Sequence, residues 1–544
     1  MRDPAISPDG RLLAYVVVEP SGTDAQIFVQ ALPNGQPQQL TRSPGLKAYL
    51  AFSQDGSRIA YTITGEAWKW DTWVTAIVGG TPRLLLPNAA ALQWLKDGRV
   101  LFSEFRRGPQ LAVVAASESR AGLHDVYVPP PDGMAHYSDP SPDERRLVIG
   151  EMRASGLYAD RAPLACFVTS TEGAASQRVG SPDIPCSMFV RWSRDGRWFY
   201  FASGRGSQFQ LFRQSAAGGR PEQITTGTGL AVRGVLTSFA LTPDGQSVVY
   251  PSGEAQETIW LRTSDETPRQ LTFEGSALDP RPSADGQRVF YIAGPRFTAG
   301  QIWARALDGS RAEQICPGFD AFSAVPNPDG RTVVFAHGDE HKKVHLWLGA
   351  IDNSSEPREI AGGDNDLANP VFSLDGRSLF YLERLAGGNT RVWRTSIDGS
   401  GARPLSDVES SLVIRGVSPD RRWLSVTRGA YTPREAWIFS VDASAPPRRL
   451  WKTWEFAWTA TNRNFLLTNA GMVSSAWLLP NPGGNFLPEG LGDDPTEATM
   501  SMAGGHKVLT ADFFVTPTPM PDGQRIIYSR VDNHSNLYRL TLPE

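Results

Sequence analysis

Cysteine is scarce in this chain, with three among 544 residues, at Cys166, Cys186 and Cys316. Three cysteines make no disulfide framework, and their spacing matches no zinc site. We expect Cys166 and Cys186 to be buried free thiols, with a disulfide between them in an oxidising compartment as the alternative. The sequence therefore predicts a fold held by its apolar core and its hydrogen bonds.

Long apolar runs are missing as well. No window approaches 18 continuous apolar residues, so we expect no membrane insertion. The first residues, MRDPAISPDG, have neither the basic nor the apolar part of a secretory signal. The sequence does not decide the compartment: it is cytoplasmic as the sequence stands, and periplasmic or otherwise extracytoplasmic if the natural chain has a further N-terminal segment.

The net charge of −4 argues against the broad basic surface that nucleic-acid binding needs.

A sustained 3.6-residue apolar period is also missing, so helices should be few. The chain instead carries a repeated turn, first seen as SPDG (7–10), followed by a short apolar strand. Successive turn aspartates are mostly 41 to 52 residues apart. They are Asp9, Asp55, Asp97, Asp143, Asp195, Asp244, Asp285, Asp329, Asp375, Asp420 and Asp522. The gap of 102 residues before Asp522 holds a degraded copy, TATNRNFLLTN (459–469).

A second feature gives the same count of twelve repeats. Each turn is followed downstream by a strand with an aromatic residue, such as QIFVQAL (26–32) or IWLRT (259–263). Tryptophans of these strands recur every 40 to 46 residues between Trp260 and Trp477. A short outer strand follows in many repeats, as in RQLTF (269–273), but the last repeat stops after its third strand, LYRLTL (537–542). Its outer strand is either absent or supplied from elsewhere.

Four short strands in about 45 residues, repeated along the chain, predict an all-β fold of tandem β-propellers with four-stranded blades. Asp-Gly suits the tight turn because glycine accepts positive φ and aspartate bonds the turn backbone. Twelve blades exceed one ring, so we expect two six-bladed rings, residues 1–273 and 274–544. A split into seven and five blades is the alternative.

The repeats resemble the TolB-like, WD-repeat-like propeller units of bacteria, whose motif is a Ser-Pro-Asp-Gly turn followed by an apolar strand. This resemblance covers essentially the whole chain and implies a binding platform. Residues 70–152, with ESRAGLHDVYVPP and GMAHYSDPSPDERRLVIGEM, are similar to the propeller region that follows the catalytic domain of certain bacterial serine/threonine kinases. That likeness implies the sensor region of a larger signalling protein.

Catalytic motifs are missing from the sequence. We find no glycine-rich phosphate loop, no His-Arg-Asp loop, no Asp-Phe-Gly and no Gly-x-Ser-x-Gly nucleophile elbow. Kinase and serine-peptidase activity are therefore not expected, and neither a cofactor nor a metal is predicted.

Polar residues in the innermost strands are the best candidates for a ligand site. Four residues before the turn aspartate several repeats have alanine or glycine, which suits a crowded axis, but others have Gln93, Asp139, Arg191 and Arg281. His136 lies just upstream of Asp139. Buried polar groups need partners. Asp139 and Arg191 could form a structural ion pair, or the group could hold an anionic or peptide ligand at a channel mouth.

Three other clusters have simpler interpretations. HGDEHKKVH (337–345) spaces three histidines four apart; between two strands this predicts a polar loop, with a weak zinc site as the alternative. GDNDLANP (363–370) begins like a calcium loop but lacks the later glycine and the distal glutamate. EAWKWDTW (66–73) has three tryptophans, which we expect to pack between blades.

The sequence therefore favours a non-catalytic propeller that binds a protein, a peptide or a small ligand across its ring faces or central channel. The alternatives are the sensor region of a larger signalling protein, and a lyase or glycosidase that works in the channel. A glycosidase would need two carboxylates about 5–9.5 Å apart.

Overall fold

A computed structural model describes residues 1–543 except for a set of short segments and single positions. These are 20–22, 65–69, 107–109, 132, 154–164, 173–175, 182, 185, 187–188, 206–207, 227–229, 232–237, 264–266, 274, 295–297, 342, 386–387, 430–433, 470–472, 489–490, 493 and 513–516. The chain forms two compact units. The first unit contains Met1–Ala255 and Asn533–Glu544, and the second unit contains Gln256–Asp532.

The prediction of an all-β chain built from four-stranded blades is confirmed. Strands account for 57% of the chain and helix for 2%. In the described residues the one α-helix is α1 (Glu497–Met502), which Thr496 caps. No described helix has the length and apolar character needed to cross a membrane.

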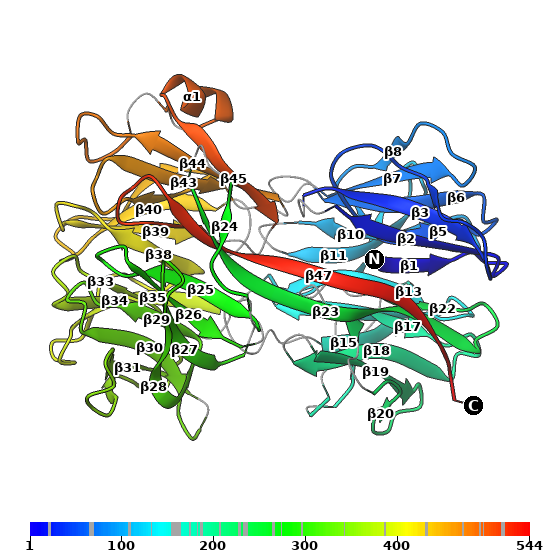
Figure 1. Cartoon of the computed structure of the whole chain (residues 1–544). Helices are drawn as coiled ribbons and strands as arrows, with labels where there is room; N and C mark the ends of the chain where they lie inside the picture. The colour runs from blue at the N-terminus through cyan, green and yellow to red at the C-terminus, as the bar shows by residue number, and fades with distance from the viewer. Residues whose placement is uncertain are drawn as a thin grey trace. The chain divides into compact units, whose positions relative to one another are not determined.

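The strands of the first unit fall into groups that follow the repeats, and a parallel contact between Leu111 and Met134 joins the third and fourth groups into one eight-stranded sheet (Figure 1). They are β1 (Arg2–Ile6), β2 (Leu12–Val18), β3 (Ala25–Ala31) and β4 (Gln38–Gln39); β5 (Leu46–Phe52), β6 (Arg58–Thr64), β7 (Trp70–Ala76) and β8 (Arg83–Leu86); β9 (Ala90–Trp94), β10 (Val100–Phe105), β11 (Leu111–Ala116) and β12 (His124–Tyr127); β13 (Gly133–Pro140), β14 (Arg146–Arg153), β15 (Ala165–Ser170) and β16 (Gln177–Val179); β17 (Val190–Trp192), β18 (Trp198–Arg205), β19 (Gln208–Ser215), β20 (Glu222–Gln223) and β21 (Leu230–Ala231); and β22 (Ala240–Leu241) with the start of β23 (Ser247–Arg262) and the end of β47 (Ile526–Thr541).

The second unit repeats this arrangement. Its strands are β25 (Ala277–Pro282), β26 (Arg288–Ala293), β27 (Gly300–Ala306) and β28 (Ala312–Ala321); β29 (Ser323–Pro326), β30 (Thr332–Gly338), β31 (Val344–Ala350) and β32 (Arg358–Ala361); β33 (Leu367–Phe372), β34 (Ser378–Arg384), β35 (Asn389–Ser396), β36 (Arg403–Pro404) and β37 (Glu409–Ser410); β38 (Leu412–Val417), β39 (Trp423–Arg428), β40 (Glu435–Ser440) and β41 (Arg448–Trp451); β42 (Trp454–Trp458), β43 (Asn464–Asn469), β44 (Val473–Pro480) and β45 (His506–Asp512); and β46 (Thr518–Pro519) with the start of β47, the end of β23, and β24 (Arg269–Gln270).

Two long strands, β23 and β47, each contribute residues to the last group of both units. β23 begins in the first unit and ends in the second, whereas β47 begins in the second and ends in the first (Figure 1). The units therefore differ from the contiguous split expected at 273/274. The strand IWLRT (259–263), which the sequence assigns to the sixth repeat, groups with the second unit, and LYRLTL (537–542) groups with the first.

The recurring turn joins the first two strands of a repeat and also contacts the next repeat. In the first turn the Ser7 hydroxyl donates to Asp9 at 2.5 Å, and the Arg11 N–H donates to the same carboxylate at 3.1 Å. Gly10 has a φ of +75°, which glycine adopts without strain.

In several repeats the turn glycine lies beside a residue of the turn in the preceding repeat. In each unit the first turn lies beside the last turn of the same unit, so the series closes on itself. A Cβ placed on Gly56 would lie 3.6 Å from Pro8. A Cβ on Gly10, in the first repeat, would lie 3.6 Å from Pro243 in the last turn of the same unit. In the second unit a Cβ on Gly286 would lie 3.7 Å from Pro521.

The innermost strands are arranged in the same order. β1 contacts β5, β5 contacts β9, β9 contacts β13 and β13 contacts β17, while β22 contacts β1. In the second unit β25, β29, β33, β38 and β42 contact one another in succession, and β46 contacts β25. This is the order expected of sheets that stand around an axis and shelter one another's apolar faces.

Cys166 on β15 forms a disulfide with Cys186, with the Cα atoms 5.7 Å apart. Our expectation of two free thiols was therefore wrong. The sequence separation of 20 residues carries no signal for pairing, and only the fold brings Cys186 beside β15. Cys316 is free and buried, and burial raises the pKa of its thiol to about 11.

Removing this disulfide should destabilise the first unit. A cross-link across 20 residues restricts the unfolded chain, so C166A/C186A should lower the free energy of unfolding by about 3 kcal/mol. Urea unfolding with and without dithiothreitol measures the effect, and the reductant should not alter the double variant. C316A is the control, because its unfolding should respond to reductant as the unchanged protein does. A midpoint of the unchanged protein that reductant does not lower would contradict the prediction.

Candidate functional site

Four of the five predicted site residues lie on neighbouring inner strands of the first unit. Gln93 is on β9, His136 and Asp139 are on β13, and Arg191 is on β17. Arg281 is on β25 of the second unit, where it forms an ion pair with Asp279 at 2.8 Å. The structure therefore brings together the first four and leaves Arg281 apart.

A β-bulge recurs on the inner strands and decides which side chains belong to this group. The pairing register shifts in β1, β5, β9 and β13 just before the positions that the sequence analysis singled out. Asp3 and Tyr49, six residues before their turn aspartates, have positive φ values of 49° and 57°. A bulge re-aims side chains locally. Asp3, Tyr49 and Tyr137 share this offset and were missed, because bulges have no sequence signature in a strand of alternating residues.

Asp139 and Arg191 form an inter-strand ion pair. Arg191 Nη1 donates to Asp139 Oδ1 at 3.0 Å, and the Trp192 N–H donates to Oδ2 at 2.8 Å. The guanidinium carbon lies 4.8 Å from the centre of the Tyr137 ring. Burial raises the pKa of Asp139, and the Arg191 charge acts against this rise. The ion pair between Asp139 and Arg191 that the sequence suggested is therefore present in the structure.

Arg191 nevertheless keeps donor capacity. Its Nε donates weakly to the Phe239 carbonyl at 3.4 Å, and within the described residues its Nη2 has no hydrogen-bond partner. The side chain is 19% exposed. One edge of the guanidinium can therefore donate to another molecule.

Gln93 and Tyr137 continue the polar group beside the ion pair. Gln93 Nε2 donates to the Tyr137 hydroxyl at 3.4 Å, and that hydroxyl donates to Asp139 at 3.4 Å. Both bonds are long, so they hold these side chains loosely. Burial raises the pKa of Tyr137 well above its usual value, which keeps the hydroxyl protonated.

Asp3 is another buried carboxylate on an inner strand of the first unit. It is 2% exposed, accepts from the Ser238 hydroxyl at 2.8 Å and lies 3.5 Å from Arg2 Nε. Burial raises its pKa, and both Arg2 and Arg191 oppose this rise. Two carboxylates and two guanidinium groups therefore balance in charge.

His136 is buried without a hydrogen bond. It is 3% exposed, and neither ring nitrogen has a partner in the described part of the chain. Its ring centre lies 5.4 Å from that of Trp70. Burial lowers the pKa of His136 to about 3, so the imidazole is neutral at physiological pH. A neutral imidazole offers one donor and one acceptor, and both are unused here.

Tyr49 connects His136 with the ion pair through aromatic contacts. Its ring centre lies 6.3 Å from Trp70 and 6.0 Å from Phe189, and Phe189 lies 5.5 Å from Tyr137. Tyr49 is 5% exposed, and no described residue bonds its hydroxyl. Burial raises its pKa, as does the negative charge of Asp3. We call Asp3, Tyr49, His136, Asp139 and Arg191 the inner-strand cluster.

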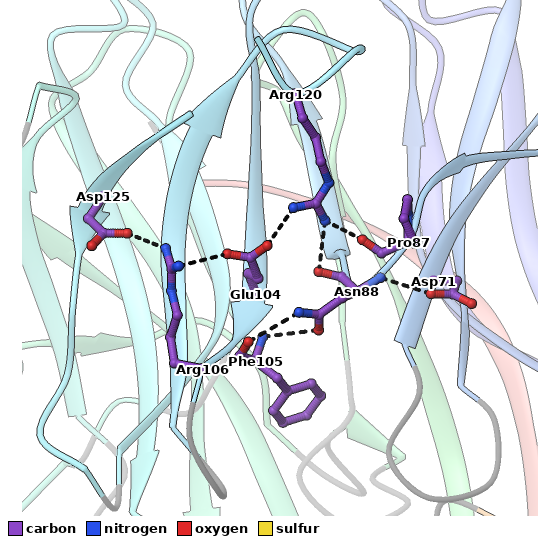
Figure 2. A network of polar contacts seen from close by, with 8 residues as sticks. All are labelled: Asp71, Pro87, Asn88, Glu104, Phe105, Arg106, Arg120 and Asp125. Atoms are coloured by element: carbon purple, nitrogen blue, oxygen red, sulfur yellow. Dashed lines mark hydrogen bonds and ion pairs between the residues drawn. The ribbon is translucent and has the colours of Figure 1, made fainter. Parts of the chain in front are cut away.

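The first unit has a second polar network, in which Glu104 forms ion pairs with two arginines. Figure 2 shows Glu104 of β10 between two guanidinium groups. Glu104 pairs with Arg106 at 3.1 Å and with Arg120 at 2.5 Å. Arg106 also pairs with Asp125, and Arg120 also donates to the Pro87 carbonyl.

Asn88 completes this network (Figure 2). Its side-chain amide donates to the Phe105 carbonyl at 3.1 Å and accepts from the Phe105 N–H at 3.3 Å. Its own N–H donates to Asp71 at 2.8 Å. These contacts hold β8, β10 and the turn after β11 together, so we assign the network a structural role.

The second unit has a buried charged triad. Glu455 of β42, whose side chain is 5% exposed, pairs with Arg434 at 2.5 Å and also with Arg415. Burial alone would raise the pKa of Glu455, but the two arginines together lower it. The Thr468 hydroxyl donates to the same carboxylate at 3.2 Å.

The remaining predicted clusters do not form a metal site in the described residues. His337 bonds the Asp320 carbonyl, His345 lies 3.0 Å from Glu359, and His341 is exposed. Asp366 accepts from the Val344 N–H at 3.0 Å, which is a loop contact. Trp70 is buried and Trp73 half-buried, as expected for packing, and Trp68 lies outside the described residues.

Comparisons with known proteins give likenesses of structure alone. No protein family and no curated protein sequence matches the chain. A putative TolB from Agrobacterium tumefaciens is 17% identical with a TM-score of 0.41, and the match covers 52% of this chain and 99% of that one.

Two larger solved structures also match. The tricorn protease is 13% identical with a TM-score of 0.34, covering 95% of this chain and 54% of that one. A GH74 enzyme from Niastella koreensis is 10% identical with a TM-score of 0.36, covering 92% and 86%. We draw no functional conclusion from these likenesses.

Proposed function

We propose that this chain is a non-catalytic binding protein made of two six-bladed β-propeller rings, and that its first unit holds a small polar ligand or a peptide at the inner-strand cluster. The contacts of Gly10 with Pro243 and of Gly286 with Pro521 support six blades in each ring. The unpartnered ring nitrogens of buried His136 carry the proposal of a ligand.

The physical argument is the cost of burying polar groups without partners. Each such group costs about 1–3 kcal/mol. His136 and Tyr49 both lie in this state, and a series of aromatic contacts through Trp70, Phe189 and Tyr137 connects them with Arg191. Arg191 Nη2 has no partner among the described residues. A molecule that brings both donors and acceptors to this place removes these costs, and it would take the place of any ordered water there.

Charge balance indicates the chemistry of the ligand. The two carboxylates of the cluster, Asp3 and Asp139, are offset by Arg191 and by the neighbouring Arg2, so no surplus positive charge is available to hold a strong anion. The tyrosine hydroxyl and the arginine need acceptors, and the imidazole takes one donor and one acceptor. A neutral group with both, such as a peptide amide, fits this set better than a phosphate does.

Titration of a panel of N-acetylated, C-amidated tripeptides tests this proposal. Isothermal titration should find at least one that binds, and His136→Phe should weaken its binding at least tenfold, equal to about 1.4 kcal/mol. His506→Phe, which changes an exposed histidine of the second unit, is the matched control and should leave binding unchanged. A panel without any binder, or equal binding by both variants, would overturn the proposal.

Catalysis in a channel has less support. Each carboxylate of the inner-strand cluster has a charged partner, Asp139 in Arg191 and Asp3 in Arg2, although Asp3 Oδ2 accepts no hydrogen bond from a described residue. A general acid or base needs a carboxyl group that can reach its substrate. The kinase-linked sensor remains a prediction, and no described feature of residues 70–152 bears on it.

A further inference from the structure

In three repeats the outer strand pairs with the third strand through a similar set of hydrogen bonds. In the first repeat the Leu40 N–H donates to the Ile27 carbonyl at 2.7 Å, and the Ile27 N–H donates to the Thr41 hydroxyl at 3.0 Å. That hydroxyl donates to the side-chain carbonyl of Gln26 at 2.9 Å. Gln39 Nε2 then donates to the Thr41 carbonyl at 2.9 Å. A Gln-Leu-Thr segment is thus held by one residue of the third strand and by the residue before it.

The same set recurs in the fifth repeat. The Ile224 N–H donates to the Leu211 carbonyl at 2.7 Å, and the Leu211 N–H donates to the Thr225 hydroxyl at 2.8 Å. Thr225 donates to Gln210 at 2.7 Å. The segment here is Gln-Ile-Thr, so the middle position accepts either branched residue.

In the second unit the end of β23 and the strand β24 repeat this set except for the bond to a glutamine side chain, since Thr258 stands where the other two repeats have glutamine. The Leu271 N–H donates to the Ile259 carbonyl at 2.7 Å, and the Ile259 N–H donates to the Thr272 hydroxyl at 2.8 Å. Ile259 is fully buried, and Leu271 is 4% exposed in a cluster with Val289, Tyr291 and Ile527. The outer strand therefore completes an apolar cluster as well as a hydrogen-bond ladder.

The end of β47 takes the place of the third strand in the last blade of the first unit. The Leu542 N–H donates to the Gln246 carbonyl, just as the Leu32 N–H donates to the Arg11 carbonyl in the first repeat. Arg11 and Gln246 are both two residues after a turn aspartate. Counting back five residues, Leu537 corresponds to Ile27.

Ring contacts confirm this register. Tyr250 and Tyr538 have ring centres 6.4 Å apart, and Tyr15 and Phe28 have ring centres 6.0 Å apart. Tyr250 and Tyr15 are both six residues after the turn aspartate. Leu537 therefore turns its N–H and C=O away from β23, and Asn536 corresponds to Gln26.

This blade has no outer strand in the described part of the chain. Leu537 is only partly buried, against Leu13, Tyr15 and Val249, which correspond by position to Val289, Tyr291 and Ile527. Nothing in that cluster corresponds to Leu271. Tyr538 is 50% exposed, whereas its counterpart Trp260 pairs with Gln270 of β24. The second unit thus shows the filled form of a place that no described strand fills in the first.

We propose that residues 536–538 form a binding edge for an extended segment of a partner polypeptide that contains Gln-Leu-Thr or Gln-Ile-Thr. The Leu or Ile N–H would donate to the Leu537 carbonyl, and the Leu537 N–H to the Thr hydroxyl. That hydroxyl would donate to the side-chain carbonyl of Asn536. The apolar side chain would fill the place that Leu271 fills in the second unit, so the partner adds a strand to the sheet.

A second copy of the chain does not fit this edge in the required register. Its own Arg539-Leu540-Thr541 shares the Leu-Thr pair of the motif. Because the Leu542 N–H donates to Gln246, the even-numbered residues here direct their backbone groups toward β23. Leu540 therefore has no outward N–H for a Leu537 carbonyl. This edge is separate from the inner-strand cluster, and neither proposal depends on the other.

The test uses the full chain and a blocked peptide, acetyl-Pro-Arg-Gln-Leu-Thr-Phe-Glu-amide, which copies residues 268–274. We expect saturable binding, with protection of the Leu537 amide from hydrogen exchange. Methylating the leucine nitrogen of the peptide removes the bond to the Leu537 carbonyl and should weaken binding at least tenfold, and replacing its threonine by valine at least fivefold.

Protein variants locate the binding. Asn536→Leu should weaken binding about fivefold, equal to about 1 kcal/mol for one hydrogen bond. Thr541→Ala, an exposed change on the same strand, should have no effect. Absence of binding up to about 1 mM, equal binding of the methylated peptide, or an unprotected Leu537 amide would overturn the proposal. Dimerisation that protects this amide without peptide would instead assign the edge to a second copy and overturn it too.

Discussion

Replacing Glu104 with alanine is expected to lower the free energy of unfolding of the first unit by about 3–4 kcal/mol. The Glu104 side chain is 8% exposed and neutralises Arg106 and Arg120 from its two oxygens (Figure 2). Without it, Arg120 keeps only carbonyl acceptors of Pro87 and Asn88, and its positive charge stays partly buried. Urea unfolding followed by tryptophan fluorescence measures the loss.

Glu172→Gln is the matched control. Glu172 also pairs with an arginine, Arg99 at 3.0 Å, but its side chain is 67% exposed. Solvent screens such a pair, so its loss should cost less than about 0.5 kcal/mol. Equal effects of E104A and E172Q would mean that burial does not govern these ion pairs and would contradict the structural role of the network.

Local sequence signals sufficed for the repeating part of the fold. The turn is specified within a few residues, since Ser7 and Asp9 bond each other and the following N–H groups. Pro8 and Gly56 then contact each other across repeats, so the same residues also set how blades stand together. A pattern that acts both locally and between repeats can be read from the chain alone.

The sequence could not show to which unit each of the two long strands contributes its third strand. IWLRT (259–263) and LYRLTL (537–542) have the same alternation, so each suits the third position of either last blade. What decides between them is long-range: β23 and β47 run side by side, and each continues past the boundary between the units. Alternation of apolar and polar residues predicts a strand and which of its faces is buried, but it does not predict with which strand it pairs.

The candidate site was predictable in part. A charged pair in a crowded inner strand must find its counterpart nearby, which is why Asp139 and Arg191 could be paired from their shared offset. Asp3 and Tyr49 were missed because positive φ at a non-glycine residue depends on the surrounding sheet. Whether a given histidine has partners depends likewise on neighbours distant in sequence, here Trp70.

His136 should make the stability of the first unit depend on pH. Its pKa in the folded protein is lowered to about 3, whereas an unfolded histidine titrates near pH 6.5. Below about pH 6.5 the unfolded chain therefore binds a proton that the folded one does not, and stability is lost as the pH falls toward 3. At pH 4.5 this loss amounts to about 3 kcal/mol relative to pH 7.

His136→Phe removes this titration and keeps an aromatic ring beside Trp70. Any cost of fitting the larger ring is the same at both pH values, so it cancels when the effect at pH 7 is subtracted from that at pH 4.5. The variant should therefore gain about 3 kcal/mol relative to the unchanged protein between these pH values. Urea unfolding at pH 7 and pH 4.5 measures the difference, and His506→Phe, at an exposed position, should show none.

An equal effect of His136→Phe at both pH values would show that the folded imidazole takes up a proton and has a partner after all. The result expected here combines acid resistance with loss of tripeptide binding in one variant. A histidine that only fills space would give the first effect without the second. A buried imidazole without hydrogen bonds destabilises the fold, and phenylalanine at the same place would not. A bound molecule that forms hydrogen bonds with the ring would offset this destabilisation, which is a reason for a histidine to stand there.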